Sequence, residues 1–363
     1  MPELPIPLLM AGLGFAIGAA FGATARLAEF CTLGAIADAF LAADRRRLRS
    51  WLLAIAVAAL VSQAMDAAGW IDLRKSIYLT ADLPWLGAAL GGLCFGFGMA
   101  LVGTCGYGAL IRLGGGDLRY LVVAVVLAVA AYMTLGGLFG VFRVGVIEAT
   151  NLELGAESQG LVDLLAGATG LSAADLRWPV VGLVVAGLLL YCFADPGFRR
   201  SRPAVLGGAV MGLLVAAGWF ATGVLGADDF DPAPLRSLTF VTPVGDALLY
   251  LMTFTGATID FGIGSVAGVI FGAFLANRAK GTLRLEGFDG KREMLRHLGG
   301  ATLMGFGGVT ALGCTVGQGI TAISTLALSG PLALGAIFLG AFMGLRFLET
   351  GRLWGGSSVV SAR

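Results

Sequence analysis

The chain has 363 residues, of which 57% are hydrophobic and 13% are charged, and its formal net charge is +1. Soluble domains carry roughly a quarter charged residues, so this composition excludes an ordinary soluble protein. The near-zero net charge also argues against nucleic-acid binding, which requires a basic surface. Apolar runs of about 20 residues, the length that crosses a bilayer, recur along the chain and predict an all-α polytopic membrane protein.

The apolar runs predict about nine transmembrane helices, at residues 6–25, 51–69, 85–104, 119–141, 179–195, 203–226, 244–277, 299–327 and 331–349. The first run lacks the basic segment of a cleavable signal peptide, so we expect it to remain as a span. The seventh and eighth runs are too long for one straight crossing, and glycine interrupts both. We expect each to combine a span with a short re-entrant helix, whose backbone must be covered by protein or water.

Three segments rich in arginine and lysine predict the orientation of these spans: residues 44–50, 198–203 and 278–296. Lysine and arginine in short loops favour the cytoplasmic side of a membrane. If these segments face the cytoplasm and successive spans cross the membrane in opposite directions, the N-terminus lies outside and the C-terminus inside.

Two glycine-rich runs share one pattern: LVGTCGYGALIRLGGGD at residues 101–117 and GFGGVTALGCTVGQG at residues 305–319. A Gly-Phe-Gly triplet begins nine residues before Cys105 and nine before Cys314, and a glycine follows each cysteine by three. The expected spans run in opposite directions there, as in inverted-repeat transporters, whose sites lie near the membrane midplane. Ordinary packing of glycine-rich helices remains the alternative.

The repeat predicts how the chain is organised. We expect a single membrane domain, residues 1–363, with approximate repeat halves at 1–150 and 200–350. A loop and linker helix at 151–199 would join these halves.

Five cysteines occur, and no two are closer than eleven residues, so the chain has no C-x-x-C redox motif. Their spacing and the lone His297 do not predict a metal site. Cys94 and Cys192 lie inside regular apolar helix, where a free cysteine behaves as a small hydrophobe. The remaining three lie at breaks rich in glycine and threonine, which favours a functional role: Cys31, Cys105 and Cys314.

These cysteine-bearing stretches, in a glycine-rich chain of this length, resemble the YeeE/YedE family of sulfur-transport membrane proteins over roughly residues 10–350. The resemblance implies an inverted-repeat, hourglass-like helical fold that takes up thiosulfate across the bacterial cytoplasmic (inner) membrane. It also implies a route lined by three cysteines, which fall on Cys31, Cys105 and Cys314. A separate cytosolic sulfurtransferase is the partner that the resemblance suggests.

Thiosulfate is a dianion with one soft sulfur and a sulfonate-like head. Neutral thiols are weak donors, and a row of them offers shallow, successive contacts that suit passage. Burial in apolar surroundings keeps thiols neutral. Flanking glycines free backbone N–H groups, and helix N-termini at the breaks favour negative charge. The residues expected to line the path are Cys31, Cys105, Cys314, Thr104, Gly106, Gly108, Gly313, Thr315, Gly317, Gln318 and Arg26.

Three charged positions leave alternatives open. Arg26 either meets an anion at one mouth of the path or pairs with Glu29, three residues further along the same helix. Asp246 and Asp260 either serve as proton sites or cap and anchor a broken helix, which is the role that we expect.

The chain carries no Walker-type phosphate-binding motif. We therefore expect a permease without an ATPase of its own, without catalytic residues, and without a metal or cofactor. Two other functions stay open: a membrane enzyme that relays sulfur covalently through its thiols, and a docking platform for the sulfurtransferase.

Overall fold

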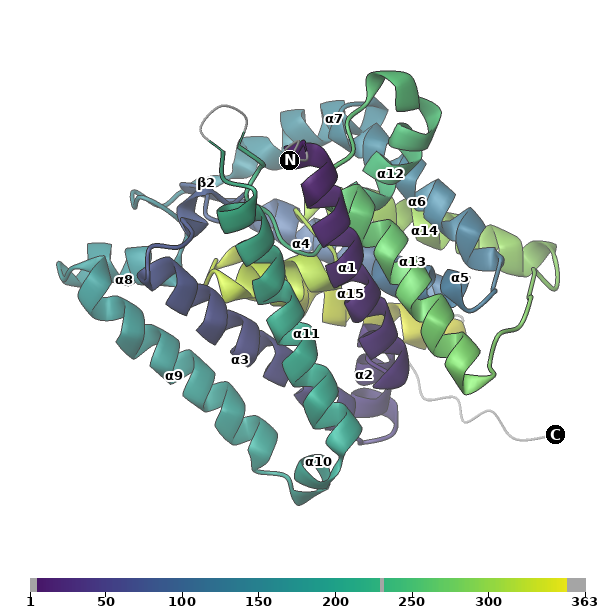
Figure 1. Cartoon of the computed structure of the whole chain (residues 1–363), viewed down its shortest axis with the longest axis horizontal. Helices are drawn as coiled ribbons and strands as arrows, with labels where there is room; N and C mark the ends of the chain where they lie inside the picture. Colours follow the sequence, from purple (N-terminus) through teal and green to yellow (C-terminus); the bar gives the residue numbers. More distant parts are fainter. Residues whose placement is uncertain (1–4, 229–231, 351–363) are drawn as a thin grey trace.

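The computed structural model describes residues 5–228 and 232–350, and helices make up most of that part of the chain (Figure 1). The α-helices are α1 (Ile6–Leu27), α2 (Thr32–Leu41), α3 (Arg46–Ala67), α4 (Trp85–Val102), α5 (Gly106–Gly114), α6 (Arg119–Leu135), α7 (Leu138–Phe142), α8 (Leu161–Thr169), α9 (Ala173–Phe193), α10 (Pro196–Arg200), α11 (Arg202–Phe220), α12 (Thr242–Met252), α13 (Phe261–Lys280), α14 (Lys291–Thr310) and α15 (Ser329–Thr350).

Short elements of other kinds connect these helices. The 3-10 and π turns are η1 (Leu73–Lys75), η2 (Arg143–Ile147), η3 (Glu148–Thr150), η4 (Ala221–Leu225), η5 (Phe254–Gly256) and η6 (Gly317–Ala322). Among the described residues, the two strands are β1 (Asp82–Leu83) and β2 (Leu152–Glu153), which pair antiparallel.

Seven helical segments of the described chain are long and apolar enough to cross a membrane, or eight if the bent pair α6 and α7 counts as one span. This confirms the expected all-α, multi-pass membrane fold, although the expected number of spans was about nine. The difference is α14, which covers part of the run at 299–327. Its first turn carries Lys291, Arg292 and Glu293, so the helix as a whole is less apolar than its neighbours.

Both long runs are broken as the sequence predicts, although the first break precedes the glycines of residues 260–268, which lie inside α13. In the run at 244–277, residues 253–260 separate α12 from α13. In the run at 299–327, α14 ends at Thr310 and a new helical turn begins at Thr315. Cys314 within the second break is fully buried, whereas the first break begins in an exposed segment at residues 251–256.

Two rows of glycine join α1 to α13. The glycines recur every fourth residue and are Gly14, Gly18 and Gly22 in α1, and Gly264, Gly268 and Gly272 in α13. A Cβ atom at Gly18 would lie 2.3 Å from the carbonyl oxygen of Ser265, and one at Gly268 would lie 2.2 Å from that of Phe15. Small residues let helix backbones approach this closely in lipid. The interface therefore fixes the end of α1, and with it the position of Cys31.

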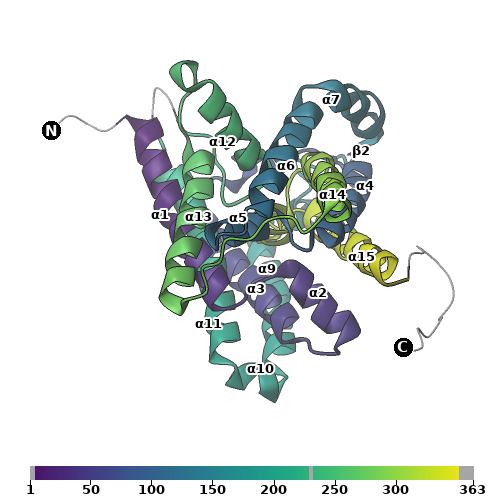
Figure 2. The ribbon, with the colours of Figure 1, turned by 90° about the vertical axis from the view of Figure 1, so that its right-hand side faces the viewer.

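Helices that are far apart in the sequence pack together in pairs. The main pairs are α1 with α13, α3 with α11, α4 with α15 and α6 with α14, and α4 also packs on α14. Figure 2 shows α1 beside α13 in one part of the molecule, and α4, α6 and α14 grouped in another. The buried core lies between these groups and includes Phe21, Trp51, Tyr107 and Phe240.

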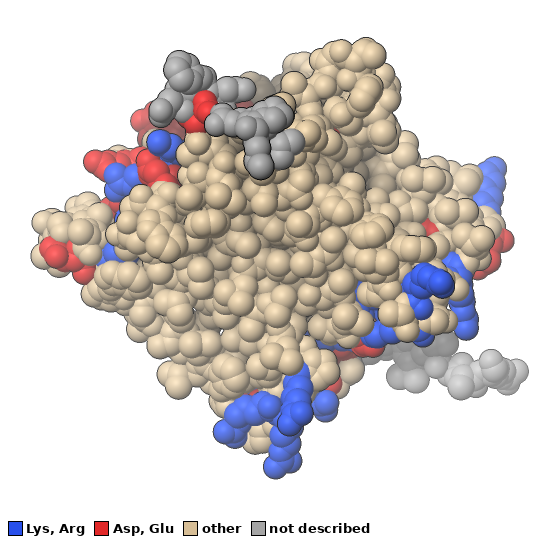
Figure 3. All heavy atoms as spheres, viewed as in Figure 1, with Lys and Arg blue, Asp and Glu red and all other residues tan. Residues whose placement is uncertain are grey.

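Lysine and arginine gather at one side of the molecule, which we call the arginine-rich face and define as residues 44–50, 198–203 and 278–296. Figure 3 shows them around α10 and where α13 ends and α14 begins, with a broad band of uncharged residues beyond. Arg49 pairs with Asp195, the N-cap of α10, which holds the first segment of this face close to the second. The chain termini, residues 1–4 and 351–363, lie outside the described residues, so the expected orientation stays a prediction.

Candidate functional site

Each of the three cysteines at the glycine-rich breaks immediately precedes a short helix. Cys31 is the N-cap of α2 and Cys105 is the N-cap of α5, while Cys314 precedes the helical turn that begins at Thr315 and continues into η6. The backbone N–H of Gly34 lies 3.4 Å from the Cys31 sulfur. Because the first N–H groups of a helix have no partner within it, each cysteine stands at the positive end of a helix.

Two threonines link the three cysteines into one row. The hydroxyl of Thr32, the residue after Cys31, lies 4.0 Å from the sulfur of Cys105. Thr315, the residue after Cys314, is fully buried near Cys105, although its hydroxyl forms no hydrogen bond within the described residues. Cys105 therefore lies between the other two cysteines, and the structure brings together three residues that are widely separated in the sequence.

The row continues beyond Cys314 to a third threonine. The hydroxyl of Thr239 lies 4.0 Å from the Cys314 sulfur. The backbone N–H groups of Val316 and Gly317, in the turn that follows Cys314, also lie near this sulfur. On the far side lies buried Tyr78, whose hydroxyl oxygen would be 3.3 Å from a Cβ atom at Gly317 and whose ring packs edge-on against Trp219, with ring centroids 6.4 Å apart.

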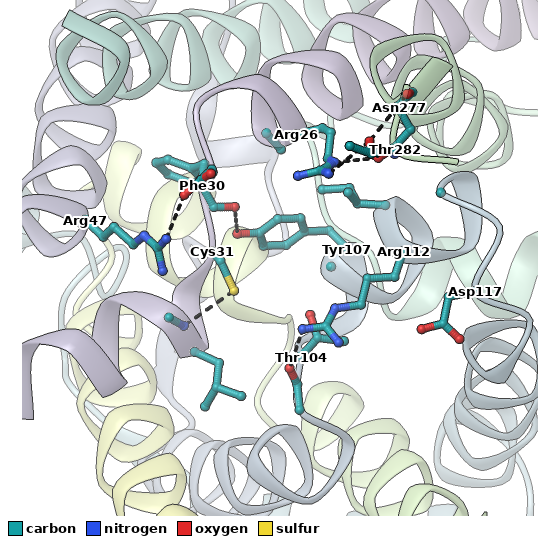
Figure 4. A pocket seen from close by; sticks show the side chains of 18 of the residues that line it. Arg26, Phe30, Cys31, Arg47, Thr104, Tyr107, Arg112, Asp117, Asn277 and Thr282 are labelled. Carbon is teal, nitrogen blue, oxygen red and sulfur yellow. Dashed lines mark hydrogen bonds and ion pairs between the residues drawn. The ribbon is translucent and has the colours of Figure 1, made fainter. Parts of the chain in front are cut away.

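A cavity of about 600 Å³ opens at the arginine-rich face and reaches Cys31. Thr104, Tyr107, Gly108 and Arg26 also line it, and Figure 4 shows Cys31 and Tyr107 pointing into the same hollow. Cys31 is partly exposed there, whereas Cys105 and Cys314 are fully buried. The cysteine row is thus open at one end and closed along the rest of its length.

The glycines that the sequence singles out permit close approach around the sulfurs. A Cβ atom at Gly108 would lie 2.0 Å from the hydroxyl oxygen of Thr104, and one at Gly317 would lie 2.5 Å from that of Thr239. Gly106 and Gly313 are less crowded: their nearest neighbours would be the carbonyl oxygen of Phe240 and the backbone nitrogen of Gln318, at 3.2 and 3.1 Å.

Thr315 and Gln318 are completely buried and carry polar atoms without partners. Apart from its contact with Cys105, the Thr315 hydroxyl has no hydrogen-bond partner in the described part of the chain, and neither does the amide oxygen of Gln318. The Gln318 amide nitrogen donates to the carbonyl of Ala311. Buried polar groups are nearly always satisfied, so these two atoms are free to contact a molecule that enters the row.

Arg26 lines the cavity and does not pair with Glu29, so the pairing alternative is wrong. Its guanidinium donates to the amide oxygen of Asn277 at 2.6 Å and to the hydroxyl of Thr282 at 3.2 Å. Helix α1 ends at Leu27, and Glu29 adopts a left-handed turn with φ of 54°. The two side chains therefore do not share a helix face, and Glu29 pairs with Arg47 at 2.8 Å instead.

Asp260 has the capping role that the sequence predicts. Its carboxylate accepts the backbone N–H of Ile263 at 2.9 Å, at the start of α13, and pairs with Arg236 at 2.7 Å. Asp246 accepts a hydrogen bond from the hydroxyl of Tyr132 at 2.5 Å and so anchors α12 to α6.

Two residues of the cavity were missed from the sequence. Tyr107 is the one bulky residue in the run GTCGYG, and its hydroxyl donates to the carbonyl of Phe30 at 3.0 Å. Arg112 is a charged residue close to a predicted span, and it also lines the cavity. The bulk of Tyr107 among glycines and the charge of Arg112 beside a span were the signals that the sequence offered.

The far wall of the cavity depends on Arg119, the first residue of α6. Its guanidinium pairs with Asp117 at 2.7 Å, with Glu286 at 2.8 Å and with Glu293 at 3.0 Å. The backbone N–H of Asp289 and the charge of Arg119 lower the pKa of the Glu293 carboxyl. This carboxylate therefore stays ionised at neutral pH, and the network holds residues 281–290 against the end of α5.

The other two cysteines lie away from the row. Cys192 is buried in a separate small cluster with Leu53 and Phe198, and its thiol donates to the carbonyl of Arg49 at 3.3 Å. Cys94 lies inside α4 and is half-buried.

Comparison with known proteins places this arrangement in a family. A family model described as sulphur transport matches residues 27–343. The thiosulfate transporter TsuA of Escherichia coli (strain K12) is 25% identical over 342 residues, which cover 91% of this chain and 92% of that protein. A thiosulfate transporter TsuA of Spirochaeta thermophila is 26% identical over 329 residues, which cover 90% of this chain and 96% of that protein. Because the family model spans most of its length, the chain belongs to the sulphur transport family.

Proposed function

We propose that the chain takes up thiosulfate, or a closely related inorganic sulfur anion, across the cytoplasmic membrane by way of the cysteine row. The observation that supports this most is the row itself, in which threonine hydroxyls lie near the sulfurs of Cys105 and Cys314. Two relatives that match nearly the whole chain are named thiosulfate transporters. The chain acts as a transporter and not as an enzyme.

The chemistry of the row suits an anion with one soft sulfur and three oxygens. Each neutral thiol offers the terminal sulfur a weak S–H contact, while the hydroxyls of Thr32, Thr315 and Thr239 can donate to the oxygens. The positive ends of the short helices offset part of the cost of removing a dianion from water. No single contact is strong, so the anion can move from one cysteine to the next.

We assign the arginine-rich face to the cytoplasm, because lysine and arginine in short loops favour that side. This orientation puts the N-terminus outside and the C-terminus inside. The cavity at Cys31 is then the inner mouth of the path, and Tyr78 and Trp219 close its outer end beyond Cys314. During uptake, this aromatic cover must move to admit the anion to Cys314, before Cys105 and Cys31 receive it.

We further propose that the membrane domain consists of two inverted halves, at about residues 1–150 and 200–350. The elements that would correspond are α1 and α11, α2 and α12, α3 and α13, α4 and α14, α5 and η6, and α6 and α15. Under this correspondence, the α1–α13 contact is equivalent to the α3–α11 contact, and the α4–α15 contact is equivalent to the α6–α14 contact. All four contacts occur in the structure. It also places Cys105 and Cys314 at equivalent positions.

The anion that leaves the inner cavity requires an acceptor in the cytoplasm. A separate cytosolic sulfurtransferase fits this step, because it would consume the imported sulfur at the mouth where it emerges. The basic segments that surround this mouth offer such a partner a charged docking surface.

The proposed function is tested by uptake of radiolabelled thiosulfate into proteoliposomes that contain only the purified protein. We expect saturable uptake by the wild type, loss of uptake in Cys105→Ala, and unchanged uptake in the matched control Cys192→Ala. Adding a proton gradient shows whether uptake is coupled. Wild-type vesicles that take up no more thiosulfate than protein-free vesicles would disprove the proposal.

A further inference from the structure

The inner cavity contains arginines that no carboxylate neutralises. Its lining includes Arg26 and Arg112, which have only uncharged partners in the described ranges 5–228 and 232–350. Arg112 donates to the hydroxyl of Tyr120 at 2.6 Å and to the carbonyl of Gly103 at 3.2 Å, and its guanidinium lies over the Tyr120 ring. Arg26 has the amide and hydroxyl partners described above.

The carboxylates that line the same cavity are already held by other arginines. Glu29 pairs with Arg47 at 2.8 Å, and Asp117 and Glu286 pair with Arg119 at 2.7 and 2.8 Å. These ion pairs hold the acids away from Arg26 and Arg112. The charged residues that line the cavity are four arginines and three acids, which leaves one positive charge in excess: Arg26, Arg47, Arg112 and Arg284 against Glu29, Asp117 and Glu286. Arg284 also lines the cavity without an ion pair among the described residues, and guanidinium groups that lack a counter-ion attract an anion.

The remaining N–H groups fit a tetrahedral oxyanion. A guanidinium carries five N–H donors in a planar fork, and the contacts above use only some of them. Such forks bind carboxylate, phosphate and similar oxyanions through paired hydrogen bonds. Figure 4 shows Arg26 and Arg112 on either side of the Tyr107 ring, with Cys31 in the same hollow.

We propose that Arg26 and Arg112 form an oxyanion-binding site at the inner end of the path, which holds a divalent tetrahedral anion beside Cys31 before its release. This proposal rests on the proposed function, because it identifies the oxygen-bearing head of the transported anion as the group that is recognised. The soft sulfur would still face Cys31, while the oxygens face the two guanidinium groups. Arg112 would thus be a binding residue that no cysteine motif reveals.

The test measures binding of sulfate and of thiosulfate to the purified full-length protein by isothermal titration calorimetry at low ionic strength. Sulfate carries the oxyanion head but no soft sulfur, so it reports on the arginines alone. We expect Arg26→Gln and Arg112→Gln each to weaken sulfate binding by about tenfold or more, because each removes charged hydrogen bonds. Arg112→Lys, which keeps the charge and loses the fork, should restore part of the affinity.

Two control variants separate binding from folding. Arg346→Gln removes an arginine that lies over the ring of Phe342, outside the cavity, and should leave sulfate binding unchanged. Tyr120→Phe removes the hydroxyl that Arg112 contacts and keeps its charge, so binding should persist. If Arg112 served only to hold Tyr120, Tyr120→Phe and Arg112→Gln would have equal effects, and this result would overturn the proposal.

The outcome is distinct from that of the transport experiment. Sulfate binding that depends on both arginines supports the site, even if proteoliposomes fail to take up thiosulfate. Normal thiosulfate uptake, together with equal sulfate affinity in the wild type and both glutamine variants, would overturn the site and leave the proposed function standing.

Discussion

The hydroxyl of Tyr107 donates a hydrogen bond to the main-chain carbonyl of Phe30 at 3.0 Å, although 77 positions separate the two residues in the sequence. Phe30 directly precedes Cys31, and Tyr107 lies two residues after Cys105. The bond therefore fixes one cysteine break against the other. Aromatic packing supports it, because Phe30 stacks on Trp51 with ring centroids 4.6 Å apart.

Removal of this hydroxyl in Tyr107→Phe should both destabilise the protein and slow uptake. The carbonyl of Phe30 would lose its partner in a buried place, which costs about 1–3 kcal/mol. Thermal unfolding in detergent measures the first effect, and proteoliposome uptake measures the second. Tyr250→Phe, a change in α12 beside Phe254, is the control and should alter neither. A Tyr107→Phe variant with wild-type stability and uptake would show that the bond does not hold the breaks.

The hydroxyl of Thr315 is expected to serve transport and not stability. Since the Thr315 hydroxyl has no hydrogen-bond partner among the described residues, Thr315→Val should lower thiosulfate uptake severalfold without lowering the unfolding temperature. The matched control is Thr321→Val, because the Thr321 hydroxyl donates to the carbonyl of Leu238 at 2.7 Å. That variant should lose about 1 kcal/mol of stability. The reverse pattern in the two variants would show that Thr315 is a structural residue.

The glycine rows between α1 and α13 predict a steep stability effect. A Cβ atom at Gly272 would lie 1.9 Å from the carbonyl oxygen of Ala19, so Gly272→Ala must push the helices apart. We expect a loss of about 1–3 kcal/mol, as for other overpacked sites. Gly182→Ala in α9, where no atom lies within 4 Å of the added methyl, should cause no loss. Equal unfolding temperatures for the two variants would contradict this view of the interface.

Within the cysteine row, Cys31 is the residue that is partly exposed. This predicts which thiol reacts with a charged reagent that cannot cross membranes. In a Cys94→Ala background, inside-out vesicles should be labelled at Cys31, whereas Cys105 and Cys314 should stay unmodified because they are fully buried. Right-side-out vesicles should be labelled much less. Peptide mass spectrometry identifies the modified residue. Labelling from the outer side only would reverse the orientation that we assign.

Much of this architecture was predictable, because apolar run length and glycine interruptions report directly on membrane helices. The break at Cys314 and the cap at Asp260 both follow from local chemistry, and the structure has both. The pairing of Arg26 with Glu29 was wrong, because three-residue spacing has meaning only while a helix continues, and α1 ends between them. Such an ending depends on tertiary packing.

The parts of the site that were missed depend on contacts across the sequence. Tyr107 matters through Phe30, and Arg112 through a cavity that residues from α1, α5 and α13 enclose. Neither relation leaves a local pattern. The convergence of the three cysteines was predicted from family resemblance and chemistry, and the threonine links between them became visible only in three dimensions.

The most direct test of the central claim compares thiosulfate uptake by the variant Cys31→Ala/Cys105→Ala/Cys314→Ala with that by Cys94→Ala/Cys192→Ala. Both proteins lack thiols at buried or half-buried positions, and only the first loses the row. We predict that uptake by the triple variant falls to that of protein-free vesicles, while the double variant keeps the wild-type rate. A folded triple variant that imports thiosulfate at the wild-type rate would contradict the claim that the cysteine row carries the anion.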